Sequence, residues 1–236
     1  YNTGLGFNAG LMNTTGCDNT AVGREAARAT TTGHRNVSVG ACSLYANTTG
    51  SNNTVVGFAA GKSNTTADIN VFVGYRTGCT NTTGIYNSIL GGVAFCSSTT
   101  ASYNASVGYA TLLSTTTGEG NIAMGTNALR ANTTASNNTG LGREAMRYNT
   151  TGHSNVAVGA YTLRCNDSGD NNVAVGYCSL NKTTSDYNTG VGYSTLRDNT
   201  SGSQNTAVGH NALIQNTTAS YNTAVGVCSM FANTTG

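Results

Sequence analysis

The sequence has no proline and no tryptophan, and only 8% of its 236 residues carry a charge, against about 25% in ordinary soluble domains. Collagen is excluded because it needs proline and a glycine at every third residue. Intrinsic disorder is disfavoured because disordered chains are rich in charge or proline. No apolar run approaches the ~20 residues of a membrane-spanning helix, and no signal-peptide pattern opens the chain. The net charge of +2 is too small to indicate a nucleic-acid partner.

What the sequence has in abundance is a repeat of 17 residues. An asparagine recurs with this period along the whole chain, apart from one step of 16 between Asn172 and Asn188, and a glycine follows each asparagine four residues later. The repeat gives 14 copies over residues 1–236. We number each copy with this asparagine at position 2, so that the consensus is x-N-T-A-V-G-x-x-A-L-x-x-N-T-T-G-x. The shortened copy lacks a residue near Asn181 and Lys182, where a loop can absorb the loss.

Seventeen residues are too few for a helix pair or a propeller blade, but they suffice for one coil of a β-solenoid. Coils would stack at the ~4.8 Å spacing of paired strands, so that the array forms a rod of roughly 65 Å. The Asn-Thr-Ala-Val run predicts a short strand, the glycine after it a position without space for Cβ, and Asn-Thr-Thr-Gly a turn. The expected fold is all-β, a parallel β-solenoid (β-roll) in a single array over residues 1–236. Because no capping copy is recognisable, we expect this array to be a segment of a longer chain.

Side-chain alternation predicts which residues face the inside of each coil. Positions 3 and 5 share one face of the strand, and positions 2 and 4 share the other. We expect position 5, such as Val22 or Val158, to point inward, and the asparagines at position 2 to hydrogen-bond along the stack. Positions 9 and 10 lie on opposite faces, so either the backbone bends there or one face is buried against another chain. We favour a partner chain facing Ala157, Ala174 and Leu163, because small residues permit close approach.

The frame G-x-x-N-T-A-V-G-x-x-A, as in Gly33–Gly40 followed by Ser43, resembles the head repeat of trimeric autotransporter adhesins, G-x-x-S-V-A-I-G-x-x-A. The longer N-T-A-V-G…N-T-T-G form is similar to arrays in phage tail-fibre-like proteins that precede a self-cleaving chaperone domain. The resemblance covers the whole chain, with an insertion at the Asn-Thr-Thr turn. It implies a left-handed β-roll, a homotrimer around one axis, and display on a cell surface or a virion. It does not specify a ligand.

The titratable residues are scattered in a way that does not indicate catalysis. His34, His153 and His210 lie several coils apart, so they cannot bind one metal ion together. The close carboxylates Asp167 and Asp170 flank a turn glycine, where such residues are typically solvated. We therefore expect no enzyme, no cofactor and no metal site.

Two groups of residues at position 11 suggest specific interactions. Cys79 and Cys96 lie there in neighbouring coils, and a Cα separation of ~4.8 Å permits a disulfide; two reduced thiols are the alternative. Arg130, Arg147 and Arg164 lie there in three consecutive coils. Stacked like charges repel, so these side chains must extend into solvent or meet an anion, such as an acidic glycan or lipopolysaccharide. Tyrosines at positions 1 and 7 could bind sugar rings, although packing is their commoner use.

The Asn-Thr-Thr turn repeats an N-x-[S/T] glycosylation acceptor at position 13. Such acceptors require an exposed turn, and the alternative is a turn in which asparagine and threonine hydrogen-bond the backbone. The candidate acceptors are Asn13, Asn47, Asn64, Asn81, Asn132, Asn149, Asn166, Asn199, Asn216 and Asn233.

These observations predict a structural segment of an extracellular fibre or adhesin that spaces or presents a binding surface. Its partners would be further copies of the chain, as a homotrimer or filament, and carbohydrate that is covalently attached or bound. We expect no insertion of this segment into a membrane. One alternative is a glycan-coated filament that serves as sheath or matrix. Another is an ice-binding solenoid, in which the threonines at position 14 form flat ladders at ~4.8 Å spacing.

Overall fold

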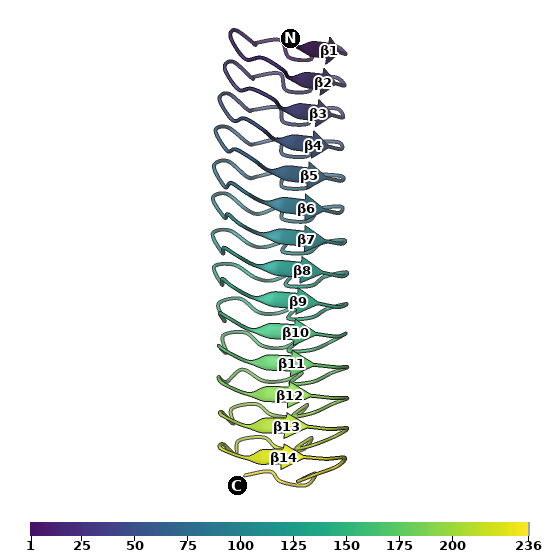
Figure 1. Ribbon diagram of the computed structural model, residues 1–236, viewed down its shortest axis with the longest axis vertical. Coiled ribbons are helices and arrows are strands. Elements are labelled where there is room, and N and C mark those ends of the chain that lie inside the picture. Colours follow the sequence, from purple (N-terminus) through teal and green to yellow (C-terminus); the bar gives the residue numbers. More distant parts are fainter. Residues whose placement is uncertain (236) are drawn as a thin grey trace. The chain divides into compact units, whose positions relative to one another are not determined.

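The computed structural model describes residues 1–235. It divides into two compact units, Tyr1–Gly120 and Asn121–Gly236, and we describe each unit by itself. The described residues contain no helix, and each repeat contributes one strand of three residues at positions 3–5 (Figure 1). The prediction of an all-β parallel solenoid with a 17-residue repeat is confirmed. The hand of the coil and the number of associated chains stay predictions.

Each unit contains seven strands that follow one another in sequence order. In the first unit they are β1 (Thr3–Leu5), β2 (Thr20–Val22), β3 (Val37–Val39), β4 (Thr54–Val56), β5 (Val71–Val73), β6 (Ser88–Leu90) and β7 (Ala105–Val107). In the second unit they are β8 (Ile122–Met124), β9 (Thr139–Leu141), β10 (Val156–Val158), β11 (Val173–Val175), β12 (Thr189–Val191), β13 (Thr206–Val208) and β14 (Thr223–Val225).

Consecutive strands within a unit pair in parallel, with equivalent positions of the repeat side by side. In β2 and β3, for example, Ala21 lies beside Ser38. The shortened copy keeps this register, because Ala174 of β11 lies beside Gly190 of β12. One repeat therefore makes one turn of the solenoid, and a missing residue is absorbed outside the strand.

The missing residue lies at position 15, slightly later than the sequence suggested. The backbone N–H of Thr183 donates to Leu180 O, which is the bond that position 13 makes in other copies. Thr184 Oγ1 donates to Thr200 O, as a threonine at position 14 does. The gap therefore follows Thr184, whereas the sequence placed it near Asn181 and Lys182. Position 15 is exposed in the turns of most other copies, so its loss disturbs little packing.

The central residue of each strand, at position 4, points into the coil. Ala157 is fully buried, whereas its neighbour Val158 is half-buried on the opposite face. The same holds for Ala21 and Val22 in β2. The prediction that position 5 points inward is therefore wrong. The larger apolar residue was assigned to the core, but the narrow coil accepts the small residue at position 4 in most copies.

Positions 9 and 10 are also buried inside the same coil. Ser43 and Leu44 have no exposed surface, although strict alternation would place them on opposite faces. The backbone turns between them, because Cys42 at position 8 and Leu44 at position 10 have φ of 55° and 48°. These left-handed residues break the alternation, so the bent backbone is the correct alternative.

It follows that Ala157, Ala174 and Leu163, each 0% exposed in the single chain, do not face a partner. The expectation that small residues at positions 4 and 9 contact a neighbouring chain is wrong. These side chains already pack against one another within their own coil, which leaves no surface for a second chain.

Copies within the first unit differ in whether the large buried side chain stands at position 4 or at position 10. Phe72 at position 4 is fully buried, and its ring lies where a side chain on Gly61 or Gly78, both at position 10, would begin. A Cβ on Gly78 would lie 2.7 Å from Phe72 Cε1. Other copies reverse the arrangement, with alanine at position 4 and leucine at position 10. The interior is thus filled from position 4 in some copies and from position 10 in others.

The glycine at position 6 is required because neighbouring coils approach closely there. Gly23 has φ of 128°, and a Cβ on it would lie 2.7 Å from the carbonyl carbon of Gly40 in the next coil. No other residue type avoids that contact, because every side chain begins with a Cβ. This explains why all copies keep a glycine at this point.

The asparagines at position 2 form a buried hydrogen-bonded ladder, as the sequence predicted. The backbone N–H of Asn36 donates to Asn19 Oδ1 at 3.0 Å, and Asn36 Nδ2 donates to Gly50 O at 2.9 Å. Each asparagine therefore satisfies one backbone donor and one backbone acceptor. Because a buried backbone group without a partner is costly, this ladder accounts for the recurrence of the residue.

Candidate interaction surfaces

The asparagines at position 13 form a second internal ladder rather than an exposed row. The eight that are 0% exposed are Asn47, Asn64, Asn81, Asn132, Asn149, Asn166, Asn199 and Asn216. Asn13 and Asn233 are half-buried. In a representative step, Asn64 Nδ2 donates to Asn47 Oδ1 at 3.0 Å and to Ala67 O at 3.2 Å.

The exposure on which the glycan prediction depends is therefore missing in the folded chain. A sugar attached to Asn64 Nδ2 would replace protons that the amide donates to Asn47 and Ala67, and the side chain has no route to solvent. The structure instead matches the alternative, in which asparagine and threonine hold the turn by hydrogen bonds.

The threonines at position 14 also use their hydroxyl groups within the chain. Thr48 Oγ1 donates to Thr65 O at 3.1 Å, and the backbone N–H of Thr48 donates to the same oxygen at 2.8 Å. The same side-chain bond recurs in other copies, for example from Thr200 to Thr217 O. These hydroxyl groups therefore bond one coil to the next. Because they are already used as donors within the chain, the interpretation of the row as an ice-binding ladder is weakened.

The two cysteines at position 11 of neighbouring coils in the first unit form the disulfide that their spacing permits. A disulfide links Cys79 and Cys96, whose Cα atoms are 5.1 Å apart. The remaining cysteines are free and lie at least partly at the surface: Cys17, Cys42, Cys165, Cys178 and Cys228.

Two of the three stacked arginines meet an anion that the chain itself supplies. Glu144 is 7% exposed, and its carboxylate lies 3.1 Å from Arg147 Nη1 and 2.8 Å from Arg164 Nε. Arg164 also lies over the ring of Tyr148, 5.2 Å from its centroid. Arg130 has no part in these ion pairs. The arginine row is therefore partly neutralised, which reduces its capacity for an external anion.

The electrostatics of Glu144 follow from this arrangement. Burial raises the pKa of the carboxyl, but hydrogen bonds from Arg164 and Arg147 outweigh burial, so the pKa lies below its ordinary value. Sequence reasoning missed Glu144, although it precedes Arg147 by three residues within one copy. The contact with Arg164 crosses to the next coil, which spacing along the chain does not reveal.

Asp198 forms ion pairs with two other cations of the second unit, as Glu144 does with Arg147 and Arg164. It lies 2.8 Å from Lys182 Nζ and 2.6 Å from Arg197 Nη2. The hydrogen bond from Arg197 holds the pKa of Asp198 below its ordinary value, against the opposing effect of burial. Cations near position 11 of the second unit thus commonly have a carboxylate beside them.

The outward side chains at positions 3 and 5, which we call the outer face, form an uncharged surface. No copy has a charged residue at either position. Several large apolar side chains of this face are exposed, including Val107 at 45% in the first unit and Met124 at 52% in the second. This surface is not apparent from the sequence, because the larger apolar residue at position 5 is expected inside the coil.

Aromatic side chains flank the outer face at positions 1 and 7. Tyr177, Tyr193 and His210 stack in succession, with ring centroids 5.4 and 5.2 Å apart. Tyr86 and Tyr103 stack at 5.2 Å on the other flank. A ring inside such a row, such as Tyr193, is covered on both faces, so it presents mainly its edge and hydroxyl group and is a poor platform for a sugar ring.

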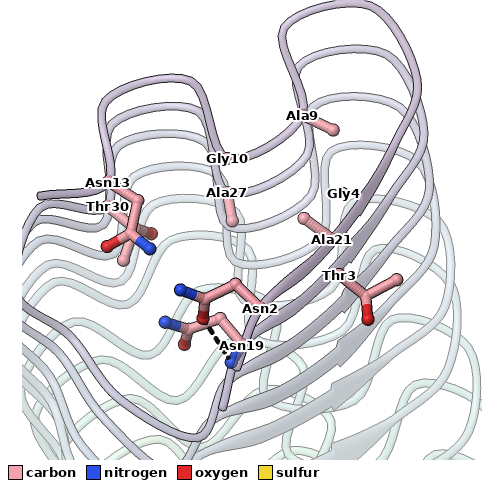
Figure 2. A pocket seen from close by; sticks show the side chains of 10 residues that line it. All are labelled: Asn2, Thr3, Gly4, Ala9, Gly10, Asn13, Asn19, Ala21, Ala27 and Thr30. Carbon is pink, nitrogen blue, oxygen red and sulfur yellow. Dashed lines mark hydrogen bonds between the residues drawn. The ribbon is translucent and has the colours of Figure 1, made fainter. Parts of the chain in front are cut away.

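A small cavity of about 80 Å³ lies inside the first two coils (Figure 2). It forms because positions 4 and 10 are both small there: Gly4 and Gly10 in the first copy, Ala21 and Ala27 in the second. Its polar wall includes Asn2 and Asn19, at the start of the ladder at position 2, and Asn13, whose Oδ1 is buried without a hydrogen-bond partner. We interpret the cavity as a packing gap.

No protein-family model matches this chain, and no curated protein or solved structure is significantly similar to it. Within residues 1–235, no three His, Cys, Asp or Glu side chains are placed to share a metal ion. The same residues include no helix of the length and hydrophobicity that a bilayer crossing requires.

Proposed function

We propose that this chain is a structural segment of an extracellular fibre or adhesin, in which copies of the chain associate through the outer face. The observation that supports this proposal is the uncharged, exposed outer face in both units. Parallel sheets are ordinarily covered on both faces, and here the coil interior covers only one. Large exposed apolar surfaces mark interaction sites, and a face repeated in every coil suits association between identical chains. The homotrimer is the assembly implied by the resemblance to adhesin heads.

The disulfide supports a location outside the cell. Disulfides persist in oxidising compartments and are rare in the cytosol, and Cys79–Cys96 joins two successive coils. The low content of charged residues, 8%, fits a chain whose surface is partly covered by copies of itself. A role as spacer or presenting surface requires no chemistry beyond this association.

Electron micrographs of the native protein test the proposed role. We expect elongated particles or filaments, in which the chains lie side by side along their repeats. Round, compact particles of single-chain size would contradict a fibre. A variant with aspartate at several positions of the outer face should lose the elongated assemblies while keeping the β-type circular dichroism spectrum of the folded chain.

A further inference from the structure

A groove of about 360 Å³ lies on the first unit, between the segment at positions 7–8 and the segment at positions 11–12. Its volume is within the range of roughly 300–1,000 Å³ that is typical of small-molecule sites. The side chains that matter for its chemistry are Phe58, Lys62, Ser63, Tyr75, Arg76 and Thr80. The groove combines two cations, two aromatic rings and several hydroxyl groups.

The two cations of the groove have no carboxylate beside them. No acidic residue lines the groove, and the ion pairs within residues 1–235 do not include Lys62 or Arg76. The second unit differs at the equivalent place, where Glu144 occupies position 8 and neutralises two arginines. Arg76 occupies position 8 here, in the coil after Lys62. Two like charges thus face one groove, and an external anion would complete it.

The two aromatic rings of the groove each keep one ring face without an aromatic neighbour in their row. Phe58 and Tyr75 stack with centroids 5.7 Å apart and an interplanar angle of 12°. The row stops on both sides, because position 7 is Ala41 in the preceding coil and Gly92 in the following one. One face of each ring therefore has no aromatic neighbour in its row. Phe58 and Tyr75 are 49% and 55% exposed, so a flat, partly apolar ring can lie against them.

Hydroxyl groups complete the lining. Thr80 Oγ1 already donates to the carbonyls of Cys96 and Ser98, so it can act toward a ligand as an acceptor. Ser63 and Tyr75 add hydroxyl groups that donate and accept. This set suits a ligand that has many hydroxyl groups of its own.

We propose that the groove binds an anionic sugar residue, a uronic acid of an acidic glycan. The carboxylate lies between Lys62 and Arg76, whose planar guanidinium matches a carboxylate with two parallel hydrogen bonds. The pyranose ring lies against Phe58 or Tyr75, and its hydroxyl groups bond Ser63 and Thr80. The site goes beyond the structural role proposed above and does not depend on self-association.

Isothermal titration of the full chain with trigalacturonic acid tests the proposal. We expect saturable binding that weakens with added salt, since the contact is charged. Maltotriose, a neutral trisaccharide, should bind at least tenfold more weakly, and sodium sulfate should displace trigalacturonic acid only at a large excess. No binding, equal binding of maltotriose, or displacement by an equal concentration of sulfate would overturn the proposal, the last by showing a simple anion site.

Matched variants locate the site. Arg76→Gln should weaken trigalacturonic acid binding on the order of tenfold, because it removes a charge-assisted contact. Arg130→Gln also removes one positive charge, but from position 11 of the second unit, outside the groove. It should change trigalacturonic acid binding less than about twofold. Equal losses in the two variants would overturn the groove as the site. Circular dichroism verifies folding, and Lys62→Gln replaces Arg76→Gln if the latter does not fold.

Discussion

Individual asparagines hold neighbouring coils together, and the interruptions of their ladder show what each one does. At position 13, Asn Nδ2 donates to the asparagine of the preceding coil, as Asn64 does to Asn47. Where the next copy has serine, the ladder breaks: Asn81 Oδ1 and Ser98 Oγ are both buried without a hydrogen-bond partner. A buried polar atom without a partner costs about 1–3 kcal/mol. The chain thus contains a local defect of known cause.

Ser98→Asn should repair this defect. The new Nδ2 can donate to Asn81 Oδ1, and the unpartnered hydroxyl disappears. We expect stabilisation of about 1 kcal/mol, or roughly 2–4 °C in the thermal midpoint. Ser97→Asn is the control, because Ser97 is exposed and lies at position 12, outside the ladder. An equal shift in both variants, or a lower midpoint for Ser98→Asn, would contradict the ladder as a source of stability.

Glu144 makes a contribution that depends on pH. Because its folded pKa lies below the ordinary value, its stabilising effect is present above the pKa of the unfolded chain and is lost as pH falls through the folded pKa. Glu144→Gln should therefore destabilise the protein by about 1–2 kcal/mol near neutral pH and by much less in acid. Unfolding by denaturant at both pH values measures the difference.

Glu25 provides the matched control for this prediction. It also occupies position 8, but its ion pair with Arg24 is long, at 3.9 Å, and Arg24 is largely exposed. Glu25→Gln should have little effect at either pH. A loss of stability in Glu144→Gln that is the same at neutral and acid pH would show that the charge of the carboxylate is not its cause.

At the scale of the element, the coil is shaped by a three-residue strand and by left-handed residues, which recur at positions 1, 8 and 10. The strand turns position 4 inward, and the left-handed residues at positions 8 and 10, such as Cys42 and Leu44, turn positions 9 and 10 inward as well. Left-handed conformations are unfavourable for residues with a Cβ, so their regular recurrence means that packing imposes them. Burial of the leucine side chain compensates the local cost.

Substitutions at two adjacent positions of β10 test this arrangement. Ala157 faces the interior and Val158 faces outward. Ala157→Asp should abolish the β-type circular dichroism of neighbouring coils, because an unpaired buried carboxylate costs several kcal/mol. Val158→Asp should keep the spectrum, since its side chain reaches solvent. The reverse outcome would restore position 5 to the interior.

The period and chemistry of the repeat made the strand, the glycine and the ladder at position 2 predictable. A strict 17-residue recurrence implies equivalent environments, and an asparagine that never varies implies a bond that every coil makes. The outward direction of the Val158 side chain and the inward direction of the Leu163 side chain were not predictable in the same way. It depends on left-handed backbone at residues whose propensity gives no sign of it, since glycine or asparagine is typical there. The pairing of Glu144 with Arg164 was missed because it joins different coils.

At the scale of the whole molecule, the chemistry of the surface follows from which positions of the repeat point out of the coil. The interior takes the residues at positions 4, 9 and 10, so the apolar side chains at position 5 remain on the surface in both units. The association that we propose would cover this face with a like face of another copy. Charges introduced there should prevent association without disturbing the interior.

The mass of the protein in solution tests the central claim most directly. Light scattering should give a multiple of 24.0 kDa for the native chain, three-fold for a homotrimer. The double variant Val158→Asp, Val191→Asp should return to 24.0 kDa with an unchanged circular dichroism spectrum. Thr151→Asp, in an exposed turn away from the outer face, should stay associated. A native chain that is monomeric at micromolar concentrations, or a double variant that remains associated, would contradict self-association through the outer face.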